Sequence, residues 1–315
     1  MQIALQFLLL VVGFIMLIKG ADWFVEGASK IADRFGIPQL IIGLTIVAMG
    51  TSAPEAAVSI ASALKGSAGI TIGNVVGSNI MNVLVILGLT AVIRAIAVQQ
   101  STIRYEIPFT IAITVILALL GLTDNRVSRV DGVILWVLMI VYLVYLLRMA
   151  KKGQSVLEDM PETSKKDTPL KMVLMVLIGG ALIVWGADVT VDAATELAKI
   201  FGMSDRLIGL TIVAFGTSLP ELVTSVTAAI KGKADIAVGN IVGSNIFNIL
   251  FVVGTTALIT PVTYSANFLV DSMVAVAAMV LLFVCVLPRK KLNRVGGIAM
   301  LVGYAAYFVY LIVAV

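Results

Sequence analysis

Two short polar motifs carry the residue types that could do chemistry in this chain. They read GTSAPE over residues 50–55 and GTSLPE over residues 216–221, and each lies inside an apolar run long enough to cross a membrane. Glu55 and Glu221 are their ionisable side chains, and no Lys or Arg is expected at comparable depth. A charge at the centre of a bilayer costs roughly 2.5 kcal/mol or more unless it is paired or hydrated. The motifs therefore indicate a place where a cation comes and goes.

The prolines and glycines of the motifs point to the same chemistry. Pro54 and Pro220 remove a backbone donor, and Gly50 and Gly216 loosen the turn before them. Carbonyl groups freed at membrane depth are tolerated only where they line an enclosed or watery site. Carboxylates and carbonyls together make a hard-oxygen site that suits calcium and sodium. The carbonyls expected to need a partner are those of Ala48, Thr51, Ala214 and Thr217.

A polar stripe follows each motif. Its three residues are spaced four apart, so that they share one face of a helix: Asn74, Ser78 and Asn82, then Asn240, Ser244 and Asn248. The pairs nearest the expected midplane favour ion ligation: Ser78 with Asn82, and Ser244 with Asn248. For the other asparagines, ligation and plain hydrogen bonding between helices stay equally open: Asn74, Asn79, Asn240 and Asn245.

Composition identifies the class of protein that must position these residues. The 315 residues are 60% hydrophobic and 13% charged, and the mean hydropathy is +1.09. A hydrocarbon layer of about 30 Å needs ~20 apolar residues per helix. The sequence thus predicts an all-α membrane protein whose ten apolar segments lie near 2–19, 38–64, 70–93, 105–123, 130–148, 172–187, 206–230, 236–259, 265–287 and 295–314.

The same composition excludes several kinds of site. The chain has one cysteine, Cys285, and no histidine, which excludes an intramolecular disulfide and metal centres built on Cys or His. The net charge of +4 is better explained as loop charge than as a nucleic-acid footprint. We expect no resident cofactor, no nucleic-acid partner and no protein partner; the lipid bilayer is the expected surrounding.

The two halves of the chain repeat each other. Residues 42–88 align without gaps to 208–254 with 28 identities in 47 positions, at a constant offset of 166. This divides the chain into a first repeat (1–148), a polar linker (149–171) and a second repeat (172–315). Each repeat holds five predicted spans, an odd number, so the second must enter the membrane from the opposite side. An inverted-topology repeat is common among secondary transporters, with binding sites near the midplane.

Orientation follows from the basic residues, which concentrate in cytoplasmic loops. With the N-terminus outside, 17 of the 22 Lys and Arg residues fall in inside loops. Both termini are therefore predicted to be extracellular and the 149–171 linker cytoplasmic, in a protein of the cell membrane.

A family resemblance attaches to these motifs. GTSAPE and GTSLPE, followed by GNVVGSNIMN and GNIVGSNIFN, resemble the two alpha repeats of the sodium/calcium exchanger family, prokaryotic type, within the cation/calcium antiporter superfamily. The resemblance covers essentially the whole chain. It implies ten transmembrane helices in two inverted five-helix repeats. It also implies exchange of three Na⁺ for one Ca²⁺ by alternating access, with the first and sixth helices sliding against the other eight.

The resemblance also implies roles for particular residues. Glu55 and Glu221 would be central ligands shared by calcium and sodium, and the carbonyls of Thr51 and Thr217 would complete the calcium site. Asn82 and Asn248 would border its middle. The flanking sodium sites would be formed by four hydroxyl groups and two carbonyls, those of Ser52, Ser78, Ser218, Ser244, Ala48 and Ala214. Some relatives, among them potassium-dependent ones, carry Asp where Asn248 stands, and the neutral amide here favours exchange without potassium.

Alternative functions stay open on the same scaffold. A proton/calcium antiporter or a sodium-coupled carrier of an organic solute would use the same fold, although the proton branch typically carries Glu in place of Gly77 or Gly243, where this chain keeps glycine followed by serine. A channel or an intramembrane enzyme fits less well, because paired deep carboxylates in inverted repeats suit an alternating site and the HExxH metalloprotease motif is absent.

Overall fold

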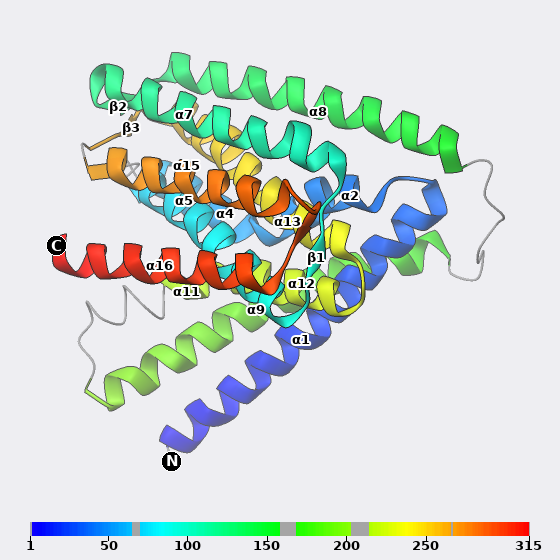
Figure 1. Cartoon of the computed structure of the whole chain (residues 1–315). Coiled ribbons are helices and arrows are strands. Elements are labelled where there is room, and N and C mark those ends of the chain that lie inside the picture. Colours follow the sequence, from blue (N-terminus) through cyan, green and yellow to red (C-terminus); the bar gives the residue numbers. More distant parts are fainter. Residues whose placement is uncertain (1, 65–69, 158–167, 203–213, 266, 315) are drawn as a thin grey trace.

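A computed structural model describes residues 2–64, 70–157, 168–202, 214–265 and 267–314, and most of them are helical (Figure 1). Within these ranges, eight helices are long and apolar enough to span a membrane, and a bent helix pair forms a ninth candidate. The predicted segment 206–230 falls partly outside the described ranges, and its described end is a shorter apolar helix, Leu219–Ile230. The all-helical membrane fold is confirmed, while ten spans stay a prediction.

The first half begins with the long helix α1 and a broken second span, and its other elements alternate between straight helices and wider π-helical turns. In chain order they are α1 (Gln2–Phe35), α2 (Gln39–Ile42), η1 (Gly43–Val47), α3 (Ala48–Thr51), α4 (Ala53–Leu64), α5 (Ile70–Met81), η2 (Asn82–Leu87), α6 (Gly88–Ile93), β1 (Ile96–Ala97), η3 (Thr102–Glu106), α7 (Ile107–Asp124), β2 (Arg126–Val127) and α8 (Arg129–Leu157).

The second half has a closely similar order of elements. They are α9 (Pro169–Ile200), α11 (Ala214–Gly216), α12 (Leu219–Ile230), α13 (Ala234–Phe247), η5 (Asn248–Val253), α14 (Gly254–Ile259), β3 (Val262–Thr263), α15 (Asn267–Val286), β4 (Lys291–Leu292) and α16 (Arg294–Ala314). Because α8 continues to Leu157 and α9 begins at Pro169, helix occupies both ends of the predicted linker.

Two helices are longer than their apolar runs predict. The first apolar run ends near residue 19, yet α1 continues to Phe35. The whole helix has 34 residues and is about 51 Å long at 1.5 Å per residue. No proline interrupts residues 2–35, and α1 ends before Gly36, whose φ of 62° is the left-handed conformation that terminates a helix. Its counterpart α9 has 32 residues. Both exceed the ~30 Å hydrocarbon layer, so their polar ends project beyond it or the helices tilt.

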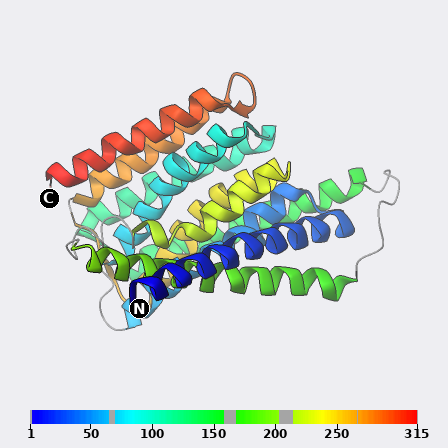
Figure 2. The same cartoon turned by 90° about the horizontal axis from the view of Figure 1, so that it is seen from below.

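Helices α1 and α9 pack against each other over much of their length (Figures 1 and 2). Small residues line this contact: Gly20 in α1 faces Gly179 in α9, and Gly13 faces Gly186. A Cβ added at Gly179 would lie 2.6 Å from the backbone nitrogen of Phe24. The two backbones therefore touch, in the way that small residues permit between membrane helices.

Helix α13 lies at the centre of the molecule. Every residue from Ile236 to Phe247 is buried, and 94% of the most apolar stretch of Ala234–Ile259 is enclosed, against 17% for α1 and for α16. The stripe that contains Ser244 thus belongs to the most enclosed helix, with no lipid-facing side. Polar residues there must find partners inside the protein.

Several elements recur at the 166-residue offset that the sequence repeat shows. The π-helical turns η2 and η5 and the short helices α6 and α14 match in this way. Two short antiparallel ribbons join the halves: β1 pairs with β4 (Ile96 opposite Leu292), and β2 pairs with β3 (Val127 opposite Val262). In Figure 1 the two ribbons lie at opposite ends of the helix bundle. Each half therefore contributes one strand at each end.

Candidate ion-binding site

The two carboxylates of the repeated motifs lie in equivalent local structures. Ser52 and Ser218 leave the helical conformation, with φ/ψ of −85°/9° and −93°/4°. The next helix then begins, so Glu55 lies in the first turn of α4 and Glu221 in the first turn of α12. At the first break the two helix pieces bend by 49°. A helix N-terminus favours negative charge, so each break presents its carboxylate to a favourable dipole.

Both carboxylates are almost fully enclosed and lie near each other. Glu55 and Glu221 are each 1% exposed, and they interact electrostatically with each other. No Lys or Arg forms an ion pair with either one among the described residues. Two like charges buried together without a basic partner are costly. The arrangement calls for a positive partner from outside the chain.

The motif of one half supports the carboxylate of the other. Ser52 Oγ donates a hydrogen bond of 2.9 Å to Glu221 Oε1, and Thr51 Oγ1 donates one of 2.9 Å to Asn240 Oδ1. The Ser78 hydroxyl lies beside the carboxylate of Glu55. The first two contacts join the break after α3 to α12 and α13, and the third joins α5 to α4 within the first half. Residues predicted from both repeats are therefore in contact at this place.

Several acceptor oxygens of these residues are buried and lack a hydrogen-bond partner within the described part of the chain. They are Glu55 Oε2, Glu221 Oε2, Asn82 Oδ1, Asn248 Oδ1 and Ser218 Oγ. Buried polar atoms in folded proteins are nearly always satisfied. Carboxylate, amide and hydroxyl oxygens are the ligands that hard cations prefer. The donor set fits Ca²⁺ or Na⁺ as a transported ion.

Two of the predicted sodium ligands, the Ala48 carbonyl and the Ser244 hydroxyl, are hydrogen-bonded to each other. The Ala48 carbonyl accepts hydrogen bonds from Ser52 N (3.0 Å), Thr51 Oγ1 (3.3 Å) and Ser244 Oγ (3.4 Å). In the second half, Ala214 begins α11 and Thr217 is half-buried just before the break. The twelve predicted residues thus lie either at the two breaks and the short helices before them, or on the polar stripes of α5–η2 and α13–η5, and their role as ligands stays a prediction.

A family model described as sodium/calcium exchanger protein matches residues 5–148 and 171–313. The chain belongs to the sodium/calcium exchanger family. Family members are transporters rather than enzymes, and the family implies Na⁺ and Ca²⁺ as the transported ions.

The alignments with individual relatives cover almost the whole chain. The sodium/calcium exchanger MaX1 of Methanosarcina acetivorans is 32% identical over 350 residues, covering 98% of this chain and 99% of that protein. The inner membrane protein YrbG of Escherichia coli is 36% identical over 315 residues, covering 96% and 95%. A solved structure of the sodium-calcium exchanger NCX_Mj superposes with a TM-score of 0.84 at 32% identity, covering 98% and 99% of the two chains. The exchanger therefore has the fold of NCX_Mj.

For two of the asparagines whose role the sequence left open, the structure shows hydrogen bonds between helices of the exchanger. Asn74 Nδ2 donates to Ser59 Oγ (3.0 Å) and to the Glu55 carbonyl (3.3 Å). Asn240 Nδ2 donates to Ser225 Oγ (2.9 Å) and to the Glu221 carbonyl (3.4 Å). Sequence reasoning missed the serine partners, although both are identical positions of the internal repeat. Each asparagine ties the polar stripe to the helix turn that carries a carboxylate.

A third buried carboxylate of the exchanger was not predicted. Glu106, at the end of η3, is 1% exposed and accepts a hydrogen bond from Tyr145 of α8. Asp271 of α15 accepts a hydrogen bond of 2.8 Å from Tyr307 of α16 in a comparable pairing of neighbouring helices. In each case a tyrosine of the following helix donates to one oxygen of the acid, a pairing that the repeated motifs do not encode. Glu106 Oε2 stays buried without a hydrogen-bond partner among the described residues.

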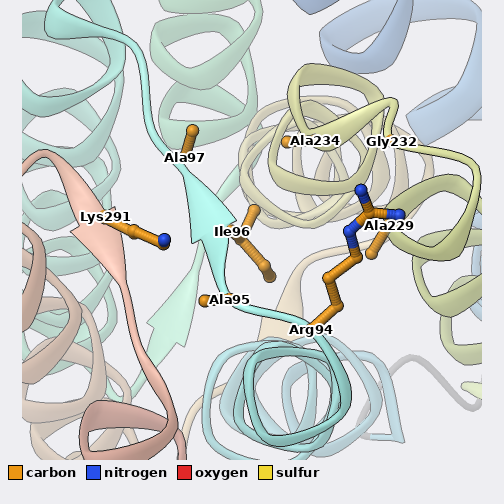
Figure 3. A pocket seen from close by; sticks show the side chains of 8 residues that line it. All are labelled: Arg94, Ala95, Ile96, Ala97, Ala229, Gly232, Ala234 and Lys291. Carbon is orange, nitrogen blue, oxygen red and sulfur yellow. The ribbon is translucent and has the colours of Figure 1, made fainter.

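An open cavity of about 260 Å³ lies elsewhere in the exchanger, between β1 and the turn that joins α12 to α13 (Figure 3). Arg94, Ile96 and Lys291 are among the residues that line it. None of the lining residues belongs to the acidic motifs or the polar stripes, and the side chains in Figure 3 are basic or apolar. This cavity does not supply the oxygen ligands that a cation needs.

Proposed function

We propose that the protein exchanges Na⁺ for Ca²⁺ across the cell membrane by alternating access, with three Na⁺ moving against one Ca²⁺ and no requirement for K⁺. The observation that carries this proposal is the pair of buried carboxylates, Glu55 and Glu221, each with an oxygen that has no partner. Membership of the exchanger family supports it. The close backbone contact at the glycines of α1 and α9 supports the movement of these two helices as one unit.

The direct test is uptake of calcium-45 into vesicles that contain the purified protein. We expect uptake when the vesicles are loaded with sodium, and only background uptake when potassium or protons are the sole counter-ion. Calcium uptake driven by a proton gradient in the absence of sodium would instead support a proton/calcium antiporter.

We also propose two inverted repeats of five spans, with both termini extracellular and the 149–171 linker cytoplasmic. Arg126, in β2, then lies outside and Arg289, before β4, lies inside; both are exposed. In a Cys285→Ala background, Arg126→Cys and Arg289→Cys are expected to react with a membrane-impermeant maleimide from opposite sides. The Cys285→Ala parent should stay unlabelled. Reaction of both cysteines from one side would contradict this topology.

Sodium coupling is expected to depend on the hydroxyl groups of the stripes. Ser244 Oγ is fully enclosed and makes a long 3.4 Å hydrogen bond to the Ala48 carbonyl, so its oxygen keeps a lone pair for Na⁺. Ser244→Ala or Ser78→Ala should raise the sodium concentration for half-maximal exchange about fivefold, the equivalent of one lost interaction of about 1 kcal/mol. The calcium dependence should change less.

The measurement is a sodium activation curve of calcium-45 flux at saturating calcium. Ser265→Ala serves as the matched control, because Ser265 is exposed in the connection between β3 and α15. Sodium activation curves that match the parent in both stripe variants would remove the serines from the sodium sites.

A further inference from the structure

Four buried asparagines form a reciprocal network between the two halves of the exchanger. They occur in pairs three residues apart, Asn79 with Asn82 and Asn245 with Asn248, and none is more than 4% exposed. Asn79 Nδ2 donates to the Asn245 carbonyl (3.2 Å), and Asn245 Nδ2 donates to the Asn79 carbonyl (3.3 Å). Each half thus holds the side chain of the other through its backbone.

These two hydrogen bonds fix the orientation of the amide groups of Asn79 and Asn245. A backbone carbonyl can only accept a hydrogen bond, so the NH₂ end of Asn79 and of Asn245 must face it. The Oδ1 end of each amide therefore faces the other way. There it accepts from the second pair: Asn248 Nδ2 donates to Asn79 Oδ1 (3.1 Å), and Asn82 Nδ2 donates to Asn245 Oδ1 (3.0 Å).

The orientation of the second pair follows in turn. Because Asn79 Oδ1 and Asn245 Oδ1 are acceptors, Asn248 and Asn82 must turn their NH₂ ends toward them. Their own Oδ1 atoms then point away as buried acceptors with no hydrogen-bond partner among the residues that the structure describes. Asn82 lies one helical turn from Ser78, which is beside the Glu55 carboxylate. A flipped amide would instead present hydrogen atoms to the site and repel a cation.

We propose that Asn79 and Asn245 are positioning residues for the transported cation, which hold Asn248 and Asn82 with their oxygens toward the ion. The inference rests on the proposed function, because it concerns the same ion site. The network is crossed: Asn79 acts on Asn248, and Asn245 acts on Asn82. It therefore links the two halves at the site and keeps the amide oxygens as uncharged ligands.

The crossed pattern predicts which substitutions interact. Asn79→Ala removes the acceptor that orients Asn248, and we expect the calcium concentration for half-maximal uptake to rise about fivefold to tenfold with the maximal rate within twofold. Once Asn248 is alanine, Asn79 has nothing to orient. The double variant Asn79→Ala/Asn248→Ala should therefore be no weaker than Asn248→Ala alone, and Asn245→Ala with Asn82→Ala should behave likewise.

The same-helix double variants are the matched controls. Asn79→Ala/Asn82→Ala and Asn245→Ala/Asn248→Ala break both crossed pairs, so each double effect should approach the product of its two single effects. A merely structural role would give the crossed and same-helix pairs equal coupling. Thermal unfolding of the detergent-purified variants shows which are folded, and the calcium concentration for half-maximal uptake is compared among folded variants.

The outcomes separate this inference from the function on which it rests. Sodium-dependent calcium uptake by the parent, with coupling confined to the crossed pairs, supports the positioning role. Uptake by the parent with equal coupling in all pairs, or with a lowered maximal rate and unchanged calcium dependence in Asn79→Ala and Asn245→Ala, overturns the positioning role alone. Absence of sodium-dependent uptake by the folded parent overturns the proposed function and this inference with it.

Discussion

Glu55→Gln and Glu221→Gln are each expected to abolish calcium exchange while leaving a folded protein in the membrane. Glutamine has the shape of glutamate and keeps an oxygen that Ser52 can still donate to at position 221. It removes one of the two negative charges that face a divalent ion. Loss of one partner from a buried charge pair costs about 3–5 kcal/mol, which corresponds to a loss of more than a hundredfold.

The measurement is sodium-driven calcium-45 uptake at equal amounts of reconstituted protein, with size-exclusion profiles to establish folding. Glu196→Gln is the matched control, because the Glu196 side chain on α9 is 42% exposed and forms a surface ion pair of 3.2 Å with Lys199. Such surface pairs contribute little, so exchange should stay within twofold of the parent. Exchange near the parent's rate in either site variant would remove that carboxylate from the site.

The acidic motifs are predictable from the sequence because an ionisable side chain stands there in a segment that must be buried. A carboxylate beside a proline in an apolar run has few structural explanations, and its recurrence at a constant offset identifies both copies. The structure places Glu55 and Glu221 at equivalent helix breaks and near each other. Proline and the preceding glycine favour a break locally at each motif.

The hydrogen bonds that a motif makes with the other half of the chain are not predictable in this way. Nearly identical motifs make different contacts: Ser52 donates to Glu221, whereas Ser218 Oγ is buried without a partner. A sequence repeat implies symmetry, but the folded chain holds its two halves in different arrangements. The length of α1 was also missed, because helix propensity carries the chain past the end of its apolar run. The tyrosine that donates to Glu106 Oε1 lies 39 residues away, beyond any local pattern.

The second large effect concerns membrane potential. The proposed ion site contains two carboxylates, so it would carry about −2 with both ionised, and one Ca²⁺ would neutralise it. Exchange of three Na⁺ for one Ca²⁺ moves one net positive charge per cycle, whatever the occupancy at each step. A potential of 100 mV then changes the driving force by roughly 2.3 kcal/mol, equivalent to about fiftyfold in the calcium gradient at equilibrium.

The sign of the effect follows from the direction of charge. Calcium uptake into sodium-loaded vesicles carries two positive charges in and three out, so an interior-positive potential should increase uptake and an interior-negative potential should decrease it. The potential is set with valinomycin and a potassium gradient, at fixed sodium and calcium. A rate and final gradient insensitive to potential would contradict an exchange of three Na⁺ for one Ca²⁺.

Potassium itself should not be required. Asn248 is a neutral amide whose NH₂ group donates to Asn79 Oδ1, whereas the family resemblance implies a carboxylate at that position in potassium-dependent relatives. Without a third negative charge, the site lacks the extra attraction that would hold K⁺ together with Ca²⁺. Replacing potassium by choline on both sides, without an ionophore, should leave sodium-driven calcium uptake unchanged. An obligatory stimulation by potassium under these conditions would mean that two carboxylates and neutral oxygens suffice to bind it, and the argument from charge would be wrong.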